Sequence, residues 1–204
     1  MVVASIGQVA KEKIVTGKNI HPDDPIIALR SSGLHSNGIT LARKILFKQW
    51  GGKHDTHVKI DGLDKELVYE ALEPTKIYVK PFLQTTKEIS VKAAVHITGD
   101  AYLKFNNLTH YSPDIGFEFN NFKPQPIFHV IQEAAQELGL TITNEEMFRT
   151  FNMGWGFAII VDQKDKDKTL DTLEKAGAEA EQIGKVTATR GIEVHHDGKK
   201  LILS

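Results

Sequence analysis

The chain has no cysteine, and this absence removes several kinds of chemistry at once. Disulfide bonds, thiolate nucleophiles and cysteine-bound metals all require that sulfur atom. No apolar run approaches the roughly 20 residues that a membrane-spanning helix needs. The first residues also lack the basic, apolar and small-residue pattern of a secretory signal. We therefore expect a cytoplasmic protein that does not bind membranes.

An excess of charge of one sign is also missing. The 25 Lys and Arg residues are balanced by 26 Asp and Glu residues, which gives a formal net charge of -1. Without a basic surface, nucleic acid and anionic lipid are not expected partners. The length of 204 residues is enough for one hydrophobic core, or for one domain with an extension.

Motifs for holding cofactors or metals are scarce. The sequence has no phosphate-binding P-loop and no dinucleotide fingerprint on a strand–helix unit. Its two histidine clusters are His54 with His57 and His195 with His196. Neither cluster has carboxylates at a spacing typical of metal ligands, so we interpret both as surface residues and predict no metal site. We expect this chain alone to bind no cofactor, and the sequence does not identify a catalytic residue.

Apolar periodicity alternates between strand-like and helix-like segments, which favours an α/β (α+β) fold with a mixed β-sheet flanked by helices. Strands are expected at residues 2–9, 26–29, 93–97, 115–119, 155–161, 179–185, 191–195 and 200–203. Helices are expected at residues 39–47, 64–72, 78–89, 102–108, 127–138, 143–152 and 164–176. Thr143 and Glu146 have the spacing of a capping box at the start of one of these helices.

The most informative segment is residues 31–38, SSGLHSNG, which joins an apolar strand to a helix. Such a loop presents backbone N–H groups and hydroxyls where the helix dipole favours an anion, such as a sugar phosphate. From the residues alone, a plain strand-to-helix turn and a ligand-binding loop are about equally favoured. His35 is a candidate general base or phosphate contact, although a lone loop histidine is more often structural. The candidate ligand-binding residues of the loop are Ser31, Ser32, His35, Ser36 and Asn37.

The same segment, followed by Leu41-Ala42-Arg43, resembles the C-terminal domain of phosphoribosylformylglycinamidine cyclo-ligases. These enzymes, also called aminoimidazole ribonucleotide synthetases, belong to purine biosynthesis. Three later segments resemble the family in the same order: residues 74–80 (PTKIYVK), 96–99 (HITG) and 147–154 (MFRTFNMG). One segment could match by chance, but four in register identify the family. The polar loop at residues 120–126 resembles the archaeal form.

The resemblance implies that Thr98 and Gly99 bind substrate, but the chain departs from the family at this turn. A glycine triplet usually follows the threonine, whereas here Gly99 is followed by Asp100 and Ala101. A carboxylate at a phosphate-binding turn repels an anion unless a metal or a basic residue intervenes. Asp100 could instead cap the following helix, and we favour that interpretation.

The resemblance also implies substrate-binding roles for Asn152 and Gly154. The glycine-containing segment at residues 150–156 is equally consistent with ligand contact and with tight helix–strand packing. Arg149 is a candidate anion partner because its planar fork suits phosphate. Lys76 and Lys80, at i and i+4 of an expected helix, form either a solvated face or a basic rim.

In this family an N-terminal domain provides the segments for ATP and Mg²⁺, and the C-terminal domain closes the cleft. The resemblance covers residues 2–203 and only the C-terminal half. We therefore expect a single C-terminal-type domain over residues 1–204 that holds a sugar-phosphate metabolite and is inactive alone. It could be a stand-alone half that works with a separately encoded ATP-binding half, a truncated product, or a relative with another use. In the family the dimer is made largely by the N-terminal domain, so the oligomeric state of this chain is left open and a homo-oligomer is possible. An exposed apolar patch is expected where the missing half packs.

Two alternatives stay open at this point. The chain could be a non-catalytic ligand-binding or regulatory module built on the same domain. It could also be half of a related ATP-using enzyme, such as selenophosphate synthetase, thiamine monophosphate kinase or a hydrogenase maturation protein. Residues 31–38 and 149–154 resemble the cyclo-ligase more than these.

Overall fold

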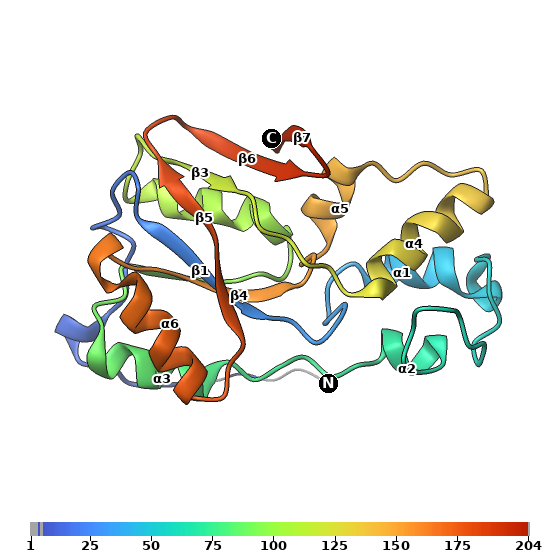
Figure 1. The fold of residues 1–204 in the computed structure, drawn as a ribbon, viewed down its shortest axis with the longest axis horizontal. Coiled ribbons are helices and arrows are strands. Elements are labelled where there is room, and N and C mark those ends of the chain that lie inside the picture. The colour runs from blue at the N-terminus through green and yellow to red at the C-terminus, as the bar shows by residue number, and fades with distance from the viewer. Residues whose placement is uncertain (1–3, 5, 204) are drawn as a thin grey trace.

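A computed structural model describes residue 4 and residues 6–203. Its centre is a seven-stranded sheet in the order β2-β4-β1-β5-β3-β6-β7 (Figure 1). Neighbouring strands are antiparallel except for β3 and β6, which are parallel. The predicted class, a mixed sheet flanked by helices, is therefore confirmed. The strands are β1 Pro25–Arg30, β2 Ala93–His96, β3 Gly116–Phe119, β4 Trp155–Ile160, β5 Ala180–Thr187, β6 Gly191–His196 and β7 Lys199–Leu203.

Two pairs of helices pack side by side, α1 with α4 and α3 with α6 (Figure 1). The α-helices are α1 Ile39–Leu46, α2 Leu67–Ala71, α3 Val79–Glu88, α4 Pro126–Glu137, α5 Asn144–Thr150 and α6 Lys166–Lys175. The 3₁₀ helices are η1 Lys11–Lys13, η2 Lys48–Trp50, η3 Ala101–His110 and η4 Gln163–Asp165. Among the described residues, no helix is both long and apolar enough to cross a membrane.

Strand β1 is buried on both faces and divides the core in two. Ile26 and Ala28 belong to the larger hydrophobic cluster, whereas Ile27 and Leu29 belong to a second cluster that includes Leu173 of α6. Successive side chains of a strand point to opposite faces, so one continuous apolar run can supply both clusters. This double burial fixes the position at which β1 ends and the loop at residues 31–38 begins.

Most expected elements are present, with three differences. Residues 4 and 6–9 form no strand, because they pair with none of the seven strands; the rest of the expected strand at residues 2–9 lies outside the described residues. The expected helix at residues 64–72 is only α2, and the one at residues 102–108 is the 3₁₀ helix η3. The capping box of Thr143 and Glu146 is confirmed at the start of α5.

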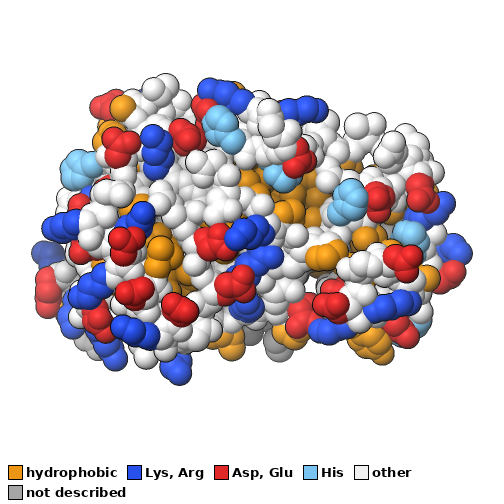
Figure 2. Space-filling model, in the orientation of Figure 1, with side chains coloured by type: hydrophobic (Ala, Val, Ile, Leu, Met, Phe, Trp, Pro, Cys, Tyr) orange, Lys and Arg blue, Asp and Glu red, His pale blue; other side chains and the backbone are white. Residues whose placement is uncertain are grey.

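Charges of both signs are mixed on the surface. Figure 2 shows Lys and Arg side chains interspersed with Asp and Glu over one face of the molecule. Ion pairs such as Lys123 with Glu181 and Lys53 with Glu137 join groups from different elements. On this face the structure shows no extended field of one sign, as the balanced composition leads one to expect.

Candidate functional site

The loop at residues 31–38 joins β1 to α1 and turns sharply at its end. Gly38 has a φ of 68°, a left-handed conformation that favours glycine. A Cβ atom at this position would lie 2.3 Å from Cε1 of Phe151, so a larger residue would clash with the ring. Ser36 is exposed and Asn37 is partly exposed just before this turn. The loop therefore presents these two polar side chains while its end is packed against Phe151.

The side chain of Asn152 supports the loop at residues 31–38 through buried hydrogen bonds. Its side chain is buried, and Nδ2 donates hydrogen bonds to the carbonyl oxygens of Gly33 at 2.8 Å and Leu34 at 3.2 Å. Its Oδ1 accepts from the N–H of Gly154 at 3.0 Å. The observed contacts of Asn152 are thus internal, and the structure shows how it supports the loop. Its predicted contact with substrate stays a prediction.

Ser31 and Gly154 also make their observed hydrogen bonds to other residues of the protein. The N–H of Ser31 donates to the carbonyl of Gly154 at 2.9 Å, and the Ser31 side chain is bonded to the amide of Gln125. Gly154 has a φ of 101°, and a Cβ there would lie 2.6 Å from the carbonyl oxygen of Lys123. Both residues join the loop to neighbouring segments. Gln125 was identified only as part of the polar loop at residues 120–126, and its contact with Ser31 was not predicted.

His35 is buried, with only 6% of its surface exposed, and has a φ of 60°. The N–H of Ser32 donates to its Nε2 at 3.1 Å, so in the neutral ring the proton lies on Nδ1. This Nδ1 is buried and has no hydrogen-bond partner among the described residues. The Ser32 hydroxyl donates to the carbonyl of Pro74 at 2.6 Å. The loop thus carries one buried donor that is free to bind an acceptor atom.

Burial, together with smaller contributions from the charges of His96 and Lys76, lowers the pKa of His35 to about 4. Burial also lowers the pKa of His96, with a second contribution from Lys104. Both rings lie near Tyr78, with ring centroids 6.2 Å and 5.8 Å away. His35 is therefore neutral at pH 7 and can act there as a hydrogen-bond donor.

Gly156 of β4 allows His35 and Tyr78 to approach the sheet. A Cβ at this position would lie 2.0 Å from the Tyr78 hydroxyl and 2.7 Å from Cε1 of His35. The Tyr78 hydroxyl donates to the carbonyl of Arg30 at 3.1 Å, and burial raises its pKa. Tyr78 lies in the family segment at residues 74–80 and in an expected helix, but its packing against His35 was not predicted because no local pattern reports it.

The turn after β2 keeps a glycine-like backbone without the glycines. Asp100 and Ala101 have φ values of 64° and 41°, both left-handed. Asp100 occupies the N-cap position of η3, but its side chain makes no capping hydrogen bond, so the expected cap is wrong. The left-handed backbone explains this, because an N-cap residue normally has the extended conformation that aims its side chain at the helix N–H groups.

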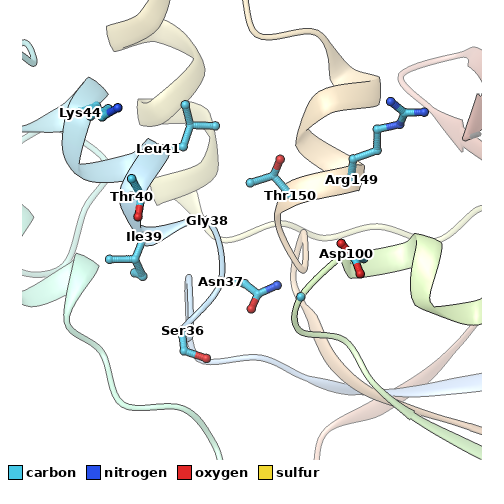
Figure 3. A pocket seen from close by; sticks show the side chains of 11 residues that line it. Ser36, Asn37, Gly38, Ile39, Thr40, Leu41, Lys44, Asp100, Arg149 and Thr150 are labelled. Atoms are coloured by element: carbon cyan, nitrogen blue, oxygen red, sulfur yellow. The ribbon is translucent and has the colours of Figure 1, made fainter. Parts of the chain in front are cut away.

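A cavity of about 520 Å³ separates this turn from the loop at residues 31–38. Figure 3 shows Asn37 on one side and Asp100 on the other, with Thr150 of α5 above them. The lining residues are Ser36, Asn37, Gly38, Ile39, Thr40, Leu41, Lys44, Gly99, Asp100, Arg149 and Thr150. The cavity therefore brings together three segments that the sequence analysis singled out separately.

Of the basic residues considered as anion partners, Arg149 lines the cavity, but Lys76 and Lys80 do not lie on one helix as expected. Lys76 precedes α3 and Lys80 lies within it, so the expected i, i+4 pair on one helix face is wrong. Lys76 is near enough to His35 to lower its pKa. Arg149 lines the cavity, and its Nε lies 3.6 Å from a carboxylate oxygen of Glu145. Lys104, which was not singled out, donates a hydrogen bond to the Thr98 hydroxyl.

One group with metal-binding side chains lies away from this cavity. Glu118, Glu193 and His195 each offer one ligand atom, and these atoms lie within 4.8 Å of one another. The group could not be predicted from sequence spacing, because β3 and β6 bring Glu118 beside Glu193 across a long chain separation. Lys200 and His195 already bond the carboxylate of Glu193 at 2.5 Å and 2.6 Å, which makes the cluster an ion-pair network.

The family resemblance implies Mg²⁺ and ATP, but the cavity lining is a poor match for this ion. Its lining contains a single carboxylate, Asp100, and Mg²⁺ is usually bound through carboxylates together with the phosphates of a nucleotide. The described residues around the cavity therefore do not provide the donor set for this ion. We assign no chemical step to a metal held by this part of the chain.

Comparison with known proteins agrees with this geometry. Residues 21–197 match the family described as AIR synthase related protein, C-terminal domain. The phosphoribosylformylglycinamidine cyclo-ligase of Methanopyrus kandleri is 38% identical over 204 residues, which are 100% of this chain and 55% of that protein. The Pyrococcus furiosus enzyme is 40% identical over 97% of this chain and 54% of its own length. The chain thus spans about half the length of these relatives.

Solved structures show the same fold at low sequence identity. HypE of E. coli, a hydrogenase maturation protein, has a TM-score of 0.56 at 16% identity, covering 92% of this chain and 51% of its own. T. maritima PurL complexed with ATP has a TM-score of 0.55 at 12% identity, covering 95% of this chain and 26% of its own. With a family match over most of its length, the chain belongs to the AIR synthase related family and contains its C-terminal domain.

Proposed function

We propose that this chain forms the sugar-phosphate side of an active site for cytoplasmic purine biosynthesis. The complete reaction would convert formylglycinamidine ribonucleotide and ATP to aminoimidazole ribonucleotide, ADP and phosphate. One observation carries the proposal: segments distant in the sequence meet at the loop of residues 31–38. The Ser32 hydroxyl of this loop donates to the carbonyl of Pro74, and the Asn152 side chain donates to the carbonyl of Gly33. Gly99 lies on the other side of the cavity from the loop.

The chain's own part in this reaction is to position the ribonucleotide. Ring closure requires an amide oxygen that ATP has activated and a nitrogen held close to the reacting carbon. Ser36, Asn37 and Gly99 border the cavity and would contact the substrate. His35 lies outside the cavity lining and its Nδ1 is buried, so a hydrogen bond from its Nδ1–H to a substrate oxygen would require the loop to move. We assign no general base.

We propose that ATP and Mg²⁺ are supplied by a second half, on this polypeptide or another, and that the 204 residues alone do not turn over substrate. Two observations support this. The similar cyclo-ligases are almost twice as long as the region that this chain matches. The cavity also contains one carboxylate rather than a set suited to Mg²⁺.

An exposed apolar surface on α3 is a suitable docking site for that half. Val79 and Leu83 lie one helical turn apart and are 61% and 52% exposed, and the preceding Ile77 is 83% exposed. Leu83 also lines a groove of about 860 Å³ together with residues 9, 12–16, 18 and 19, near the start of the domain. A half that precedes this domain would enter beside the same surface, which we call the α3 patch (Ile77, Val79 and Leu83).

The test is a titration followed by an activity assay. We expect calorimetry to detect binding of formylglycinamidine ribonucleotide to the purified chain. ADP release would then be measured for the chain, for the ATP-binding half of the Pyrococcus furiosus relative, and for their mixture, with only the mixture expected to turn over. Turnover by the chain alone would refute its inactivity. Binding without turnover in the mixture would favour a non-catalytic module, and absence of binding would favour another enzyme of the same fold.

A further inference from the structure

The turn at residues 98–101 presents an electrostatic difficulty for a phosphate ligand. Asp100 is exposed, lines the cavity and makes no capping bond that would neutralise its carboxylate. A phosphate monoester carries up to two negative charges near neutral pH, so this carboxylate repels it. The backbone nevertheless keeps left-handed φ values at Asp100 and Ala101. A cation in the same turn is needed if this backbone is to bind phosphate.

Lys104 is such a cation. It follows Asp100 by four positions on η3, is only partly exposed, and donates a hydrogen bond to the hydroxyl of Thr98. Among the described residues, no carboxylate oxygen lies within 4.0 Å of a Lys104 nitrogen, as an ion pair would require. Its charge reaches His96, whose pKa is lowered by burial and then by this lysine. Lys104 is therefore a positive charge without a negative partner beside a substrate-binding turn.

The surroundings of Lys104 reinforce its preference for an anion. Lys76 is exposed and close enough to His35 for its charge to lower the pKa of that ring, and no ion pair joins it to the described carboxylates. Burial lowers the pKa of both His35 and His96, so neither ring adds a positive charge at neutral pH. His35 adds a buried Nδ1–H with no partner. Among the described residues, two lysines without an ion-pair partner and one histidine donor without a hydrogen-bond partner thus lie in this part of the protein.

We propose that Lys104, with the Thr98 hydroxyl, binds the phosphate monoester of the substrate and replaces the backbone contacts of the missing glycines. The lysine offsets the repulsion from Asp100, and Thr98 orients its ammonium group toward the turn. This inference rests on the proposed function, because it assumes a sugar-phosphate ligand at this site. It adds a residue that neither the sequence pattern nor the family motif identified.

The test uses ribose 5-phosphate and, separately, inorganic phosphate, titrated calorimetrically into the full chain at low ionic strength. Lys104→Gln is expected to weaken binding of ribose 5-phosphate at least about tenfold, because a charge-assisted hydrogen bond is lost. Lys175→Gln removes the same charge from a remote, exposed position on α6 and should leave the affinity within about twofold of wild type. Asp100→Asn should strengthen binding, and Lys104→Arg should retain it.

A second measurement separates binding from folding. The imidazole signals of His96 can be titrated by NMR, and Lys104→Gln should raise the pKa of His96 because a neighbouring positive charge is removed. If wild type binds ribose 5-phosphate and Lys104→Gln binds it equally well while remaining folded, the role of Lys104 is refuted and the proposed function survives. If wild type binds neither ribose 5-phosphate nor formylglycinamidine ribonucleotide, both fall. Equal weakening in Lys175→Gln would also refute the specific role of Lys104.

Discussion

Asn152 and Gly33 are 119 positions apart in the chain, and a 2.8 Å hydrogen bond joins the side-chain amide of one to the carbonyl of the other. The bond is buried and connects the segment after α5 to the loop after β1. The backbone of Asn152 is held in turn, because the Tyr102 hydroxyl donates to its carbonyl at 2.9 Å. Three segments that border the cavity are therefore linked through one residue.

Replacing Asn152 should destabilise the domain more than an ordinary polar substitution does. Asn152→Ala leaves the carbonyls of Gly33 and Leu34 and the N–H of Gly154 without their partner in a buried place. Each unsatisfied buried group costs about 1–3 kcal/mol, so a total loss of several kcal/mol is expected. Urea denaturation measures it. The exposed Asn107→Ala is the control, and a similar small effect for both variants would contradict the role of Asn152.

Gly38 should be far less tolerant of alanine than Gly139. Both have left-handed φ values, 68° and 75°, so the backbone strain of the substitution is similar. Only Gly38 faces Phe151, at 2.3 Å from the added Cβ, whereas nothing lies within 4 Å at Gly139. Overpacking typically adds about 1–3 kcal/mol, so Gly38→Ala should lower the free energy of unfolding by that amount beyond Gly139→Ala. Equal losses would show that the loop can move away from the ring.

Much of the fold could be predicted because local patterns determine it. The apolar run of β1 and the capping box at Thr143 each act over a few residues, and both are found where expected. The strand expected near the N-terminus is absent from the described residues because a strand also needs a neighbour to pair with, which no local pattern reports. The 3₁₀ form of η3 likewise depends on the unusual backbone at Asp100 and Ala101.

The candidate site could be predicted by segment but not by role. Family motifs pointed to Ser31 and His35 alike, yet the structure buries Ser31 in bonds to Gln125 and leaves the Nδ1 of His35 without a partner. Lys104 carried no motif signal, because its position beside Thr98 depends on the path of the chain between them. Roles of this kind follow from three-dimensional contacts between segments, and spacing in the sequence does not contain them.

The pKa of His35 should make the domain less stable at mildly acidic pH. The unfolded histidine titrates near 6.5 and the folded one at about 4, so between these values the unfolded state binds more protons. Stability is therefore expected to fall as the pH falls from 6.5 to 4, by up to about 3 kcal/mol for this group. Well above pH 6.5 the histidine is neutral in both states and has no effect on stability.

The measurement is the free energy of unfolding at several pH values for wild type and His35→Gln. Subtracting the two curves removes the other titrating groups, and the difference should be constant above pH 7 and change toward pH 4. His129→Gln replaces an exposed histidine on α4 and serves as the control. An NMR pKa of His35 near 6.5 in the folded protein would contradict the burial of its ring as the controlling factor.

The α3 patch should matter for association with the ATP-binding half and not for folding of the domain. Leu83→Asp and Ile77→Asp place a charge on side chains that are 52% and 83% exposed, so the free energy of unfolding should change by less than about 1 kcal/mol. In a complex the same charge would be buried without a partner, and binding should weaken at least about tenfold. Ile202→Asp, on the exposed side of β7 and 54% exposed, is the matched control. Affinity of the chain for the ATP-binding half can be measured by biolayer interferometry. Weakening by Ile202→Asp but not by the two α3 variants would move the docking surface from α3 to the β7 edge of the sheet.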